Sequence, residues 1–252
     1  MSEYHKIQTV FLRDPETKFR TLLDGQWALP EFEYLADNQW AFTEKVDGTN
    51  IRVMIEAPED AWQGHRVTFG GKTDDAQIPA FLVTRLQERF LTQRAKLAEM
   101  FPAGAVLYGE GYGAKIQKGG GNYRKDSDFV LFDVRVGDWW LQRADVEDVA
   151  NKLALDVVPI VGRGTLHEMV TAVRDGTVSM WGPFVAEGIV ARPTTELRSR
   201  SGHRIITKLK HKDFAAVAQS AERLASNQEV AGSIPVGRSN TPAPARAPTP
   251  ES

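Results

Sequence analysis

Short segments in which apolar and polar residues alternate constrain the fold of this chain more than any other feature. The segment 39–44 alternates in this way, the pair Asp47-Gly48 follows, and the alternation resumes over 51–55. A period of two is typical of strands with one buried face, and Asp-Gly favours a tight reversal. The sequence therefore predicts a β-hairpin over 39–55.

Further strands follow from β-branched and aromatic runs of strand length. They are predicted around Val67 and Phe69 and at 106–108, 129–136, 188–191 and 204–209. The runs 106–108 and 129–136 are expected to be core strands of one sheet, separated by the turn-rich stretch 111–128.

Three helices are predicted from apolar residues at helical spacing. The first spans 80–101, and the second spans 144–155. The third, 165–174, begins with the capping box Thr165-x-x-Glu168 and ends at Gly176.

These elements indicate an α+β fold in which antiparallel sheets pack against helices. A chain of 252 residues is long enough for one main domain, which we expect to span 1–226 and to end with a helix at 216–226. The remainder, 227–252, is expected to be a largely disordered tail, because its last residues are mostly Pro, Ala, Thr and Ser.

Composition excludes several kinds of chemistry. The chain has no cysteine, so it can form neither a disulfide framework nor a thiolate metal site. No apolar run approaches the length of a membrane span, and the beginning of the chain lacks a signal sequence, so we expect a cytoplasmic protein. A net charge of -2 argues against coating nucleic acid by bulk charge, although a local basic patch remains compatible with it.

The sharpest local motif is the run Glu44-Lys45-Val46-Asp47-Gly48-Thr49-Asn50. On its own it is most often an ordinary turn with a solvated lysine. Four more motifs follow it in order: Tyr108-Gly109-Glu110-Gly111, Phe129 to Asp133, Glu187-Gly188-Ile189-Val190 and Lys208-Leu209-Lys210.

Five motifs in this order resemble those of the covalent nucleotidyltransferase superfamily, which includes polynucleotide ligases and messenger-RNA capping enzymes. Lys45, Gly48, Thr49 and Asn50 are most similar to the first motif of the RNA ligases of the second bacteriophage type. Asp47 departs from the histidine common in that group and matches DNA ligases and capping enzymes instead. The resemblance implies the nucleotidyltransferase fold, with ATP held in a cleft.

The resemblance also implies a role for each matched residue. Lys45 would be the nucleophile, with Lys208 and Lys210 as further catalytic residues. Glu187 would lie near the metal, Mg²⁺, and the α-phosphate, while Glu110 would bind the ribose and Phe132 would stack on adenine. Nucleotide contacts are also expected from Glu44, Gly48, Asn50 and Lys72, the last in place of an arginine that commonly contacts phosphate.

Elementary chemistry supports the grouping of lysines. A lysine amine attacks phosphorus only when it is deprotonated, and lysine is ordinarily cationic at neutral pH. Nearby cations such as Lys208, Lys210 and Mg²⁺ favour the neutral amine and also screen the triphosphate. Without the other motifs, an edge strand with two solvent-exposed lysines would be an equally good interpretation of Lys208 and Lys210.

Two basic segments are candidates for binding a polynucleotide. Between Arg192 and Asp213 there are seven Lys or Arg residues, and between Lys115 and Lys125 there are four with no acidic residue. Such segments can follow phosphates, and the alternative is a solvated loop.

The sequence thus predicts an ATP-dependent RNA ligase that forms lysyl-AMP, adenylylates a 5′-phosphate end and joins it to a 3′-hydroxyl. The expected partners are RNA ends or nicks, including RNA–DNA hybrids. Only 42 residues follow Lys210, too few for the OB-fold domain that DNA ligases and capping enzymes place there. The alternatives are a DNA ligase and an RNA-end-binding or nucleotide-binding module that cannot complete sealing alone.

Overall fold

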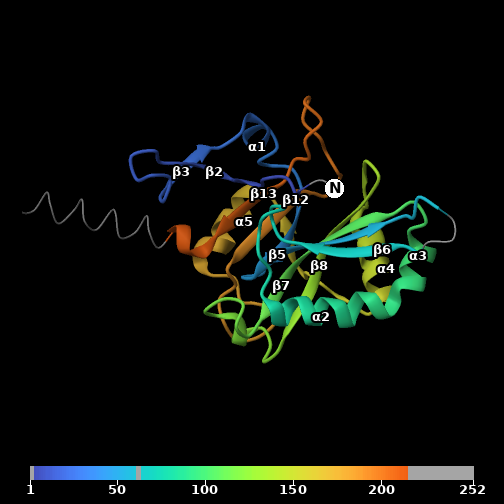
Figure 1. The fold of residues 1–252 in the computed structure, drawn as a ribbon. Helices are drawn as coiled ribbons and strands as arrows, with labels where there is room; N and C mark the ends of the chain where they lie inside the picture. Colours follow the sequence, from blue (N-terminus) through green and yellow to red (C-terminus); the bar gives the residue numbers. More distant parts are fainter. Residues whose placement is uncertain (1–2, 61–63, 215–252) are drawn as a thin grey trace, which may run out of the picture.

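Two β-sheets form the centre of the protein, and helices cover their outer faces (Figure 1). The structure is a computed structural model that describes residues 3–60 and 64–214. The predicted combination of antiparallel sheets and packed helices is confirmed. The expected helix at 216–226 and the tail at 227–252 lie outside the described residues.

The five-stranded sheet has the order β1-β13-β12-β4-β11. Its strands are β1 (Gln8–Thr9), β4 (Trp40–Lys45), β11 (Ile160–Gly164), β12 (Gly188–Pro193) and β13 (Thr207–Lys210). All neighbours are antiparallel except β1, which runs parallel to β13.

The six-stranded sheet has the order β10-β8-β7-β5-β6, with β9 paired to β8. Its strands are β5 (Thr49–Glu56), β6 (Arg66–Gly70), β7 (Ala105–Gly113), β8 (Ser127–Val136), β9 (Trp139–Trp140) and β10 (Asp156–Val157). The predicted pairing of the runs at 106–108 and 129–136 is confirmed, because β7 and β8 are antiparallel neighbours.

The predicted hairpin over 39–55 is wrong. Its two strands exist, but β4 pairs with β12 and β11 while β5 pairs with β7 and β6. The turn at Asp47-Gly48 therefore carries the chain from one sheet to the other. Alternation reveals which face of a strand is buried, but it does not reveal the strand's partner.

The helix predicted over 80–101 is interrupted. It consists of α2 (Ala80–Phe90), a 3-10 turn η1 (Leu91–Gln93) and α3 (Arg94–Met100). Near the break, the side chains of Thr92 and Gln93 donate to the backbone carbonyls of Glu88 and Arg89. Such side-chain bonds compete with the helical ladder, which gives a local reason for the change of pitch.

The other two predicted helices are confirmed as α4 (Arg143–Leu153) and α5 (Leu166–Asp175). Thr165 and Glu168 form the complete capping box, and Gly176 ends α5 in the left-handed conformation. Helices α2 and α4 cover the six-stranded sheet, and α5 covers the five-stranded sheet.

Each sheet buries one face against its helices. Ile51, Val53 and Ile55 of β5 enter the core beneath α2 and α4, while Trp40 and Phe42 of β4 enter the core beneath α5. Because side chains alternate along a strand, the intervening residues face the space between the two sheets.

The N-terminal region contains elements that the alternation did not predict. Strands β2 (Phe11–Arg13) and β3 (Leu22–Trp27) form a separate two-stranded sheet, and α1 (Pro30–Tyr34) follows. In Figure 1 these elements lie above the end of the five-stranded sheet that carries β13.

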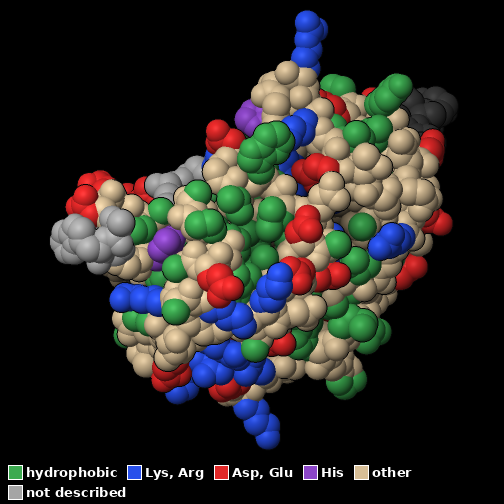
Figure 2. Space-filling view, turned by 90° about the vertical axis from the view of Figure 1, so that its right-hand side faces the viewer, with side chains coloured by type: hydrophobic (Ala, Val, Ile, Leu, Met, Phe, Trp, Pro, Cys, Tyr) green, Lys and Arg blue, Asp and Glu red, His purple; other side chains and the backbone are tan. Residues whose placement is uncertain are grey.

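Charges of both signs are mixed on the face of the protein on the side of α3 and α4. Figure 2 shows basic and acidic side chains interspersed there around a hydrophobic hollow. None of the helices in 3–60 and 64–214 is long and apolar enough to cross a membrane.

Candidate active site

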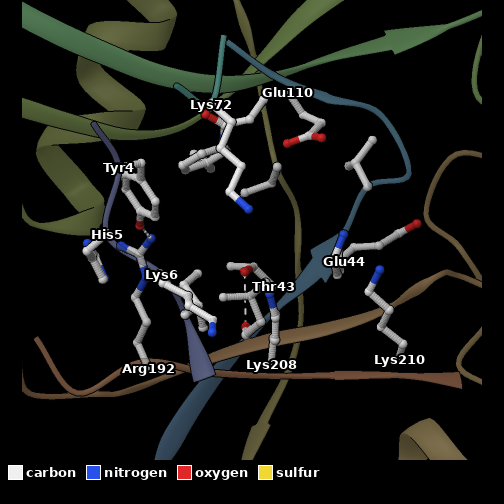
Figure 3. A pocket seen from close by; sticks show the side chains of 17 residues that line it. Tyr4, His5, Lys6, Thr43, Glu44, Lys72, Glu110, Arg192, Lys208 and Lys210 are labelled. Atoms are coloured by element: carbon white, nitrogen blue, oxygen red, sulfur yellow. Dashed lines mark hydrogen bonds between the residues drawn. The ribbon is translucent and has the colours of Figure 1, made fainter. Parts of the chain in front are cut away.

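A pocket of about 260 Å³ lies between the inner faces of the two sheets. Lys45 of β4 lines it from the five-stranded sheet. Lys208 and Lys210 of β13 enter it from the same sheet (Figure 3). The six-stranded sheet and its loops contribute Asn50, Lys72, Glu110 and Phe132. Val190 of β12 also lines the pocket, so the fold brings residues from all five sequence motifs together in one cavity.

Glu187 joins two of these lysines. Strand β12 lies between β4 and β13, and Gly188 pairs in register with both Lys45 and Lys210. Glu187, one residue earlier, accepts hydrogen bonds from Lys45 Nζ at 2.5 Å and Lys210 Nζ at 2.6 Å. All three side chains are at most a quarter exposed, so water screens this ion-pair cluster only partly.

The two lysines decide the charge of Glu187. Burial alone would raise its pKa, but the charges and hydrogen bonds of Lys45 and Lys210 outweigh burial and lower the pKa below its ordinary value. Glu187 is therefore a carboxylate at neutral pH, able to accept a proton or bind a cation.

Lys208 has no carboxylate partner among the described residues. Burial, followed by the charges of Lys45, Lys210 and Lys72, lowers its pKa to about 8. A cluster of cations with little compensating charge is suited to a polyanionic ligand, because a bound phosphate removes their mutual repulsion.

Glu110 faces the pocket from β7, opposite Asn50 on β5. Burial is the main cause that raises its pKa to about 8, and the nearby carboxylates of Glu187 and Asp47 raise it further. Glu110 is thus largely protonated at neutral pH and can donate as well as accept a hydrogen bond. The side-chain oxygen of Asn50 is buried without a partner in the described structure, which leaves an acceptor available to a ligand.

Gly48 permits the close approach of the turn after Lys45 to β7. A Cβ at this position would lie 2.3 Å from the carbonyl oxygen of Gly111 and 2.6 Å from Cγ of Glu110. The absence of a side chain at Gly48 therefore lets the turn after Lys45 lie directly against the strand that carries Glu110.

Lys72 reaches the pocket from the loop after β6 (Figure 3). Arg52, fully buried on the inner face of β5, holds this loop by donating to the Gly71 carbonyl at 2.8 Å and to Asp74 at 2.7 Å. Arg52 was not among the predicted site residues. It lies at a polar position of the alternating segment, and a buried arginine cannot be told from an exposed one by that pattern.

Phe132 lines the pocket beside an N-terminal segment that the sequence did not assign to the site. The ring of Tyr4 contacts Phe132 edge to face, with 5.1 Å between centroids. Tyr4 also donates to Asp133 at 2.9 Å, and this buried carboxylate accepts from Arg192 at 3.0 Å and Arg204 at 2.5 Å. The N-terminal segment is thereby fixed to both sheets, and no periodicity in residues 3–7 signals this role.

Glu44 occupies the other face of β4 from Lys45, as the period of two requires. Its carboxylate accepts from the Ser179 hydroxyl at 2.6 Å and from the Met180 amide at 2.8 Å. In Figure 3 this carboxylate points away from the centre of the pocket. Glu44 lines the pocket and its carboxylate anchors the segment that leads to Glu187, while its contact with the nucleotide stays a prediction.

The two basic segments differ from a uniform cationic surface. In the segment 192–213, Arg192 and Arg204 are committed to Asp133. In the segment 115–125, Arg124 is paired with Asp126 and with the buried Asp128. Only part of each segment is therefore available to a polynucleotide.

A self-contained metal site is absent from the described residues. No group of three or more His, Asp or Glu side chains in 3–60 and 64–214 is placed to hold a metal ion. Magnesium in nucleotide sites commonly uses one or two carboxylates together with phosphates and water. Glu187 could supply the carboxylate of such a site, and the lysines around it could hold the phosphates that complete it.

Comparison with known proteins identifies the family. A sequence model of the family described as RNA ligase matches residues 38–210, which contain all five motifs. The chain therefore belongs to the RNA ligase family.

Solved structures of RNA ligase from Naegleria gruberi share the fold. A variant with AMP and Mn has a TM-score of 0.55 at 15% identity, covering 83% of this chain and 58% of that one. A variant with ATP and Mn gives 0.55 at 16% identity, covering 83% and 56%. An apo variant gives 0.56 at 15% identity, covering 86% and 59%. The chain thus spans less than two thirds of the Naegleria chains it resembles.

Proposed function

We propose that this protein is an ATP-dependent RNA ligase that works through a lysyl-AMP intermediate. The observation that carries the proposal is the placement of Lys45, bound to Glu187, in a cationic pocket between the two sheets. Membership of the RNA ligase family and the ATP and AMP bound by the Naegleria enzyme variants support the same substrate. The proposal includes the nucleotidyltransferase fold and the resemblance to bacteriophage type-2 RNA ligases.

The first step would transfer AMP to the enzyme. The Lys45 amine attacks the α-phosphorus of ATP, a nitrogen–phosphorus bond forms, and the bond to pyrophosphate breaks. Lys45 must lose a proton for this attack, and Glu187 is the carboxylate already in contact with its ammonium group. Lys208, Lys210 and Lys72 would neutralise charge on the phosphates.

The next two steps would seal the strand. A 5′-phosphate oxygen of RNA attacks the lysyl-AMP phosphorus and releases the Lys45 amine. The 3′-hydroxyl of the other RNA end then attacks the adenylylated phosphate and displaces AMP. The substrates would be RNA ends or nicks, including nicks in RNA–DNA hybrids.

The remaining pocket residues would bind and orient the nucleoside. Protonated Glu110 and the unpartnered oxygen of Asn50 are suited to ribose hydroxyls. Phe132 offers a ring for stacking on adenine. Glu187 would be the protein ligand of Mg²⁺, which would polarise the phosphate when bound.

The decisive experiment incubates the protein with Mg²⁺ and ATP or GTP labelled at the α-phosphate. We expect label from ATP alone on the wild-type chain and none on Lys45→Ala. The matched control is Lys96→Ala on the distant helix α3, which should be labelled like the wild type. Undiminished labelling of Lys45→Ala would refute the proposal.

A second assay separates a complete ligase from a module that only accepts AMP. The labelled protein is mixed with 5′-phosphorylated RNA and with a nicked duplex whose flanking sugars are RNA or DNA. We expect sealing that requires RNA on the 3′-hydroxyl side. Label transfer without sealing would favour the module, and equal sealing of DNA nicks would favour a DNA ligase.

A further inference from the structure

The loop between β7 and β8 is a compact structure with its own hydrogen bonds. The amide of Ala114 donates to the carbonyls of Arg124, at 3.1 Å, and Asp126, at 2.9 Å, which closes the base of the loop. Within the loop, the Tyr123 amide donates to the Gly120 carbonyl at 3.1 Å. The segment 115–125 is therefore held in a defined position relative to the sheets.

The inner side of this loop contacts the turn that follows Lys45. Gln117 donates from its amide to the Gly48 carbonyl, and the Tyr123 hydroxyl accepts from the Asp47 amide, both at 3.1 Å. Tyr123 is buried and packs edge to face against Trp181. The loop is thus adjacent to the nucleophile's turn.

The loop carries exposed positive charge. Lys115, Lys118 and Lys125 are exposed, and none of them has an ion-pair partner among the described residues. Arg124, the fourth cation, is neutralised by Asp126 and Asp128. Three uncompensated ammonium groups therefore stand on an ordered loop beside the active site, and they do not line the pocket itself.

We propose that Lys115, Lys118 and Lys125 form a contact surface for the phosphate backbone of the RNA strand to be joined. This inference rests on the proposed ligase function and adds the position of the polynucleotide. Phosphates are the chemistry that fits, because exposed lysines on one loop attract a polyanion without reading its sequence. The other basic segment is less suited, since its Arg192 and Arg204 are committed to Asp133.

The test compares two double variants that each remove two positive charges. One is Lys118→Ala with Lys125→Ala, and its matched control is Arg94→Ala with Lys96→Ala at exposed positions of α3. Lys115 is left unchanged because its φ of 68° makes substitution there hard to interpret. The probe is a fluorescent 5′-phosphorylated single-stranded RNA without ATP, and its anisotropy is measured over a range of salt concentrations.

Each phosphate contact to single-stranded nucleic acid contributes about 0.7 to the slope of log affinity against log salt. Loss of two contacts should therefore reduce that slope by about 1.4 in the loop variant alone. Over a roughly fourfold rise in salt, wild-type affinity should fall about sevenfold more than that of the loop variant. Both variants should accept label from α-labelled ATP as the wild type does.

Two outcomes overturn the inference. If the loop variant and the control bind RNA with the same affinity and slope as the wild type, these lysines do not contact RNA. If the loop variant loses labelling by ATP while it remains folded by circular dichroism, the lysines act on the Lys45 turn instead. A variant with Gln at both positions repeats the comparison should the Ala variant unfold. Failure of wild-type labelling would refute the proposed function and is recognisable before any variant is tested.

Discussion

Replacing Glu110 with Gln should raise the free energy of unfolding above that of the wild type at high pH. At low pH this advantage over the wild type should be absent. Burial raises the pKa of Glu110 from its ordinary 4.5 to about 8, so the folded state holds a proton that the unfolded state releases. Wherever the folded state binds more protons, stability falls as pH rises. Glu110 therefore contributes fully below about pH 4.5 and loses this contribution progressively up to about pH 8.

The size of the effect follows from the difference between the pKa of Glu110 in the unfolded state and in the folded state. At about 1.36 kcal/mol per pKa unit, the shift to about 8 limits the loss to about 5 kcal/mol. Water that reaches the partly exposed carboxyl reduces this, and we expect roughly 2–3 kcal/mol. Gln stays neutral at every pH and avoids the loss.

Urea unfolding at about pH 5 and about pH 8.5 measures the difference. The difference in the free energy of unfolding between Glu110→Gln and the wild type should increase by roughly 2–3 kcal/mol towards high pH. All other titrating groups are shared by the two proteins, so their contributions cancel in this difference. Glu33→Gln, at an exposed position of α1, is the matched control and should show no widening. A difference that stays constant or narrows as pH rises would refute a Glu110 that is protonated at neutral pH in the folded protein.

Three further perturbations test other parts of the site. Gly48→Ala places a methyl group 2.3 Å from the Gly111 carbonyl, so urea unfolding should show a loss of about 1–3 kcal/mol together with loss of ATP labelling. Asp133→Asn removes the buried carboxylate that pairs with Arg192 and with the buried Arg204, which keeps only Glu196, and the free energy of unfolding should fall by about 3 kcal/mol or more. The affinity for a non-hydrolysable ATP analogue, measured by calorimetry, should fall by up to about tenfold between about pH 7 and pH 9, because Lys208 loses its charge near pH 8. Lys208→Arg should flatten this pH dependence, since arginine stays charged.

Sequence reasoning could single out candidate site residues because each motif joins a chemically reactive side chain to a glycine or a short strand. The lysines at positions 45, 208 and 210 lie in the same pocket, as the period of two along β13 and the order of motifs indicated. The same periodicity indicates where the Glu44 side chain lies, while its contact with the nucleotide stays a prediction. As the neighbour of Lys45 on a strand, it must point to the opposite face.

The residues that sequence reasoning missed act through contacts between segments distant in the chain. Tyr4 reaches Asp133 across 129 positions, and Arg52 supports the loop of Lys72 from a different strand. Neither forms a local pattern, because long-range hydrogen bonds leave no mark on the spacing of neighbouring residues.

The sequence by itself determined which residues are chemically competent and which strands have a buried face, since both depend on residue type and local spacing. Only the tertiary structure decided that β4 and β5 belong to different sheets. The physical reason is that a turn at Asp47-Gly48 fits a hairpin and a crossover equally well, and the partner of each strand is chosen by burial of its apolar face against distant helices. That choice opens the space between the sheets in which Lys45, Glu187 and Glu110 meet.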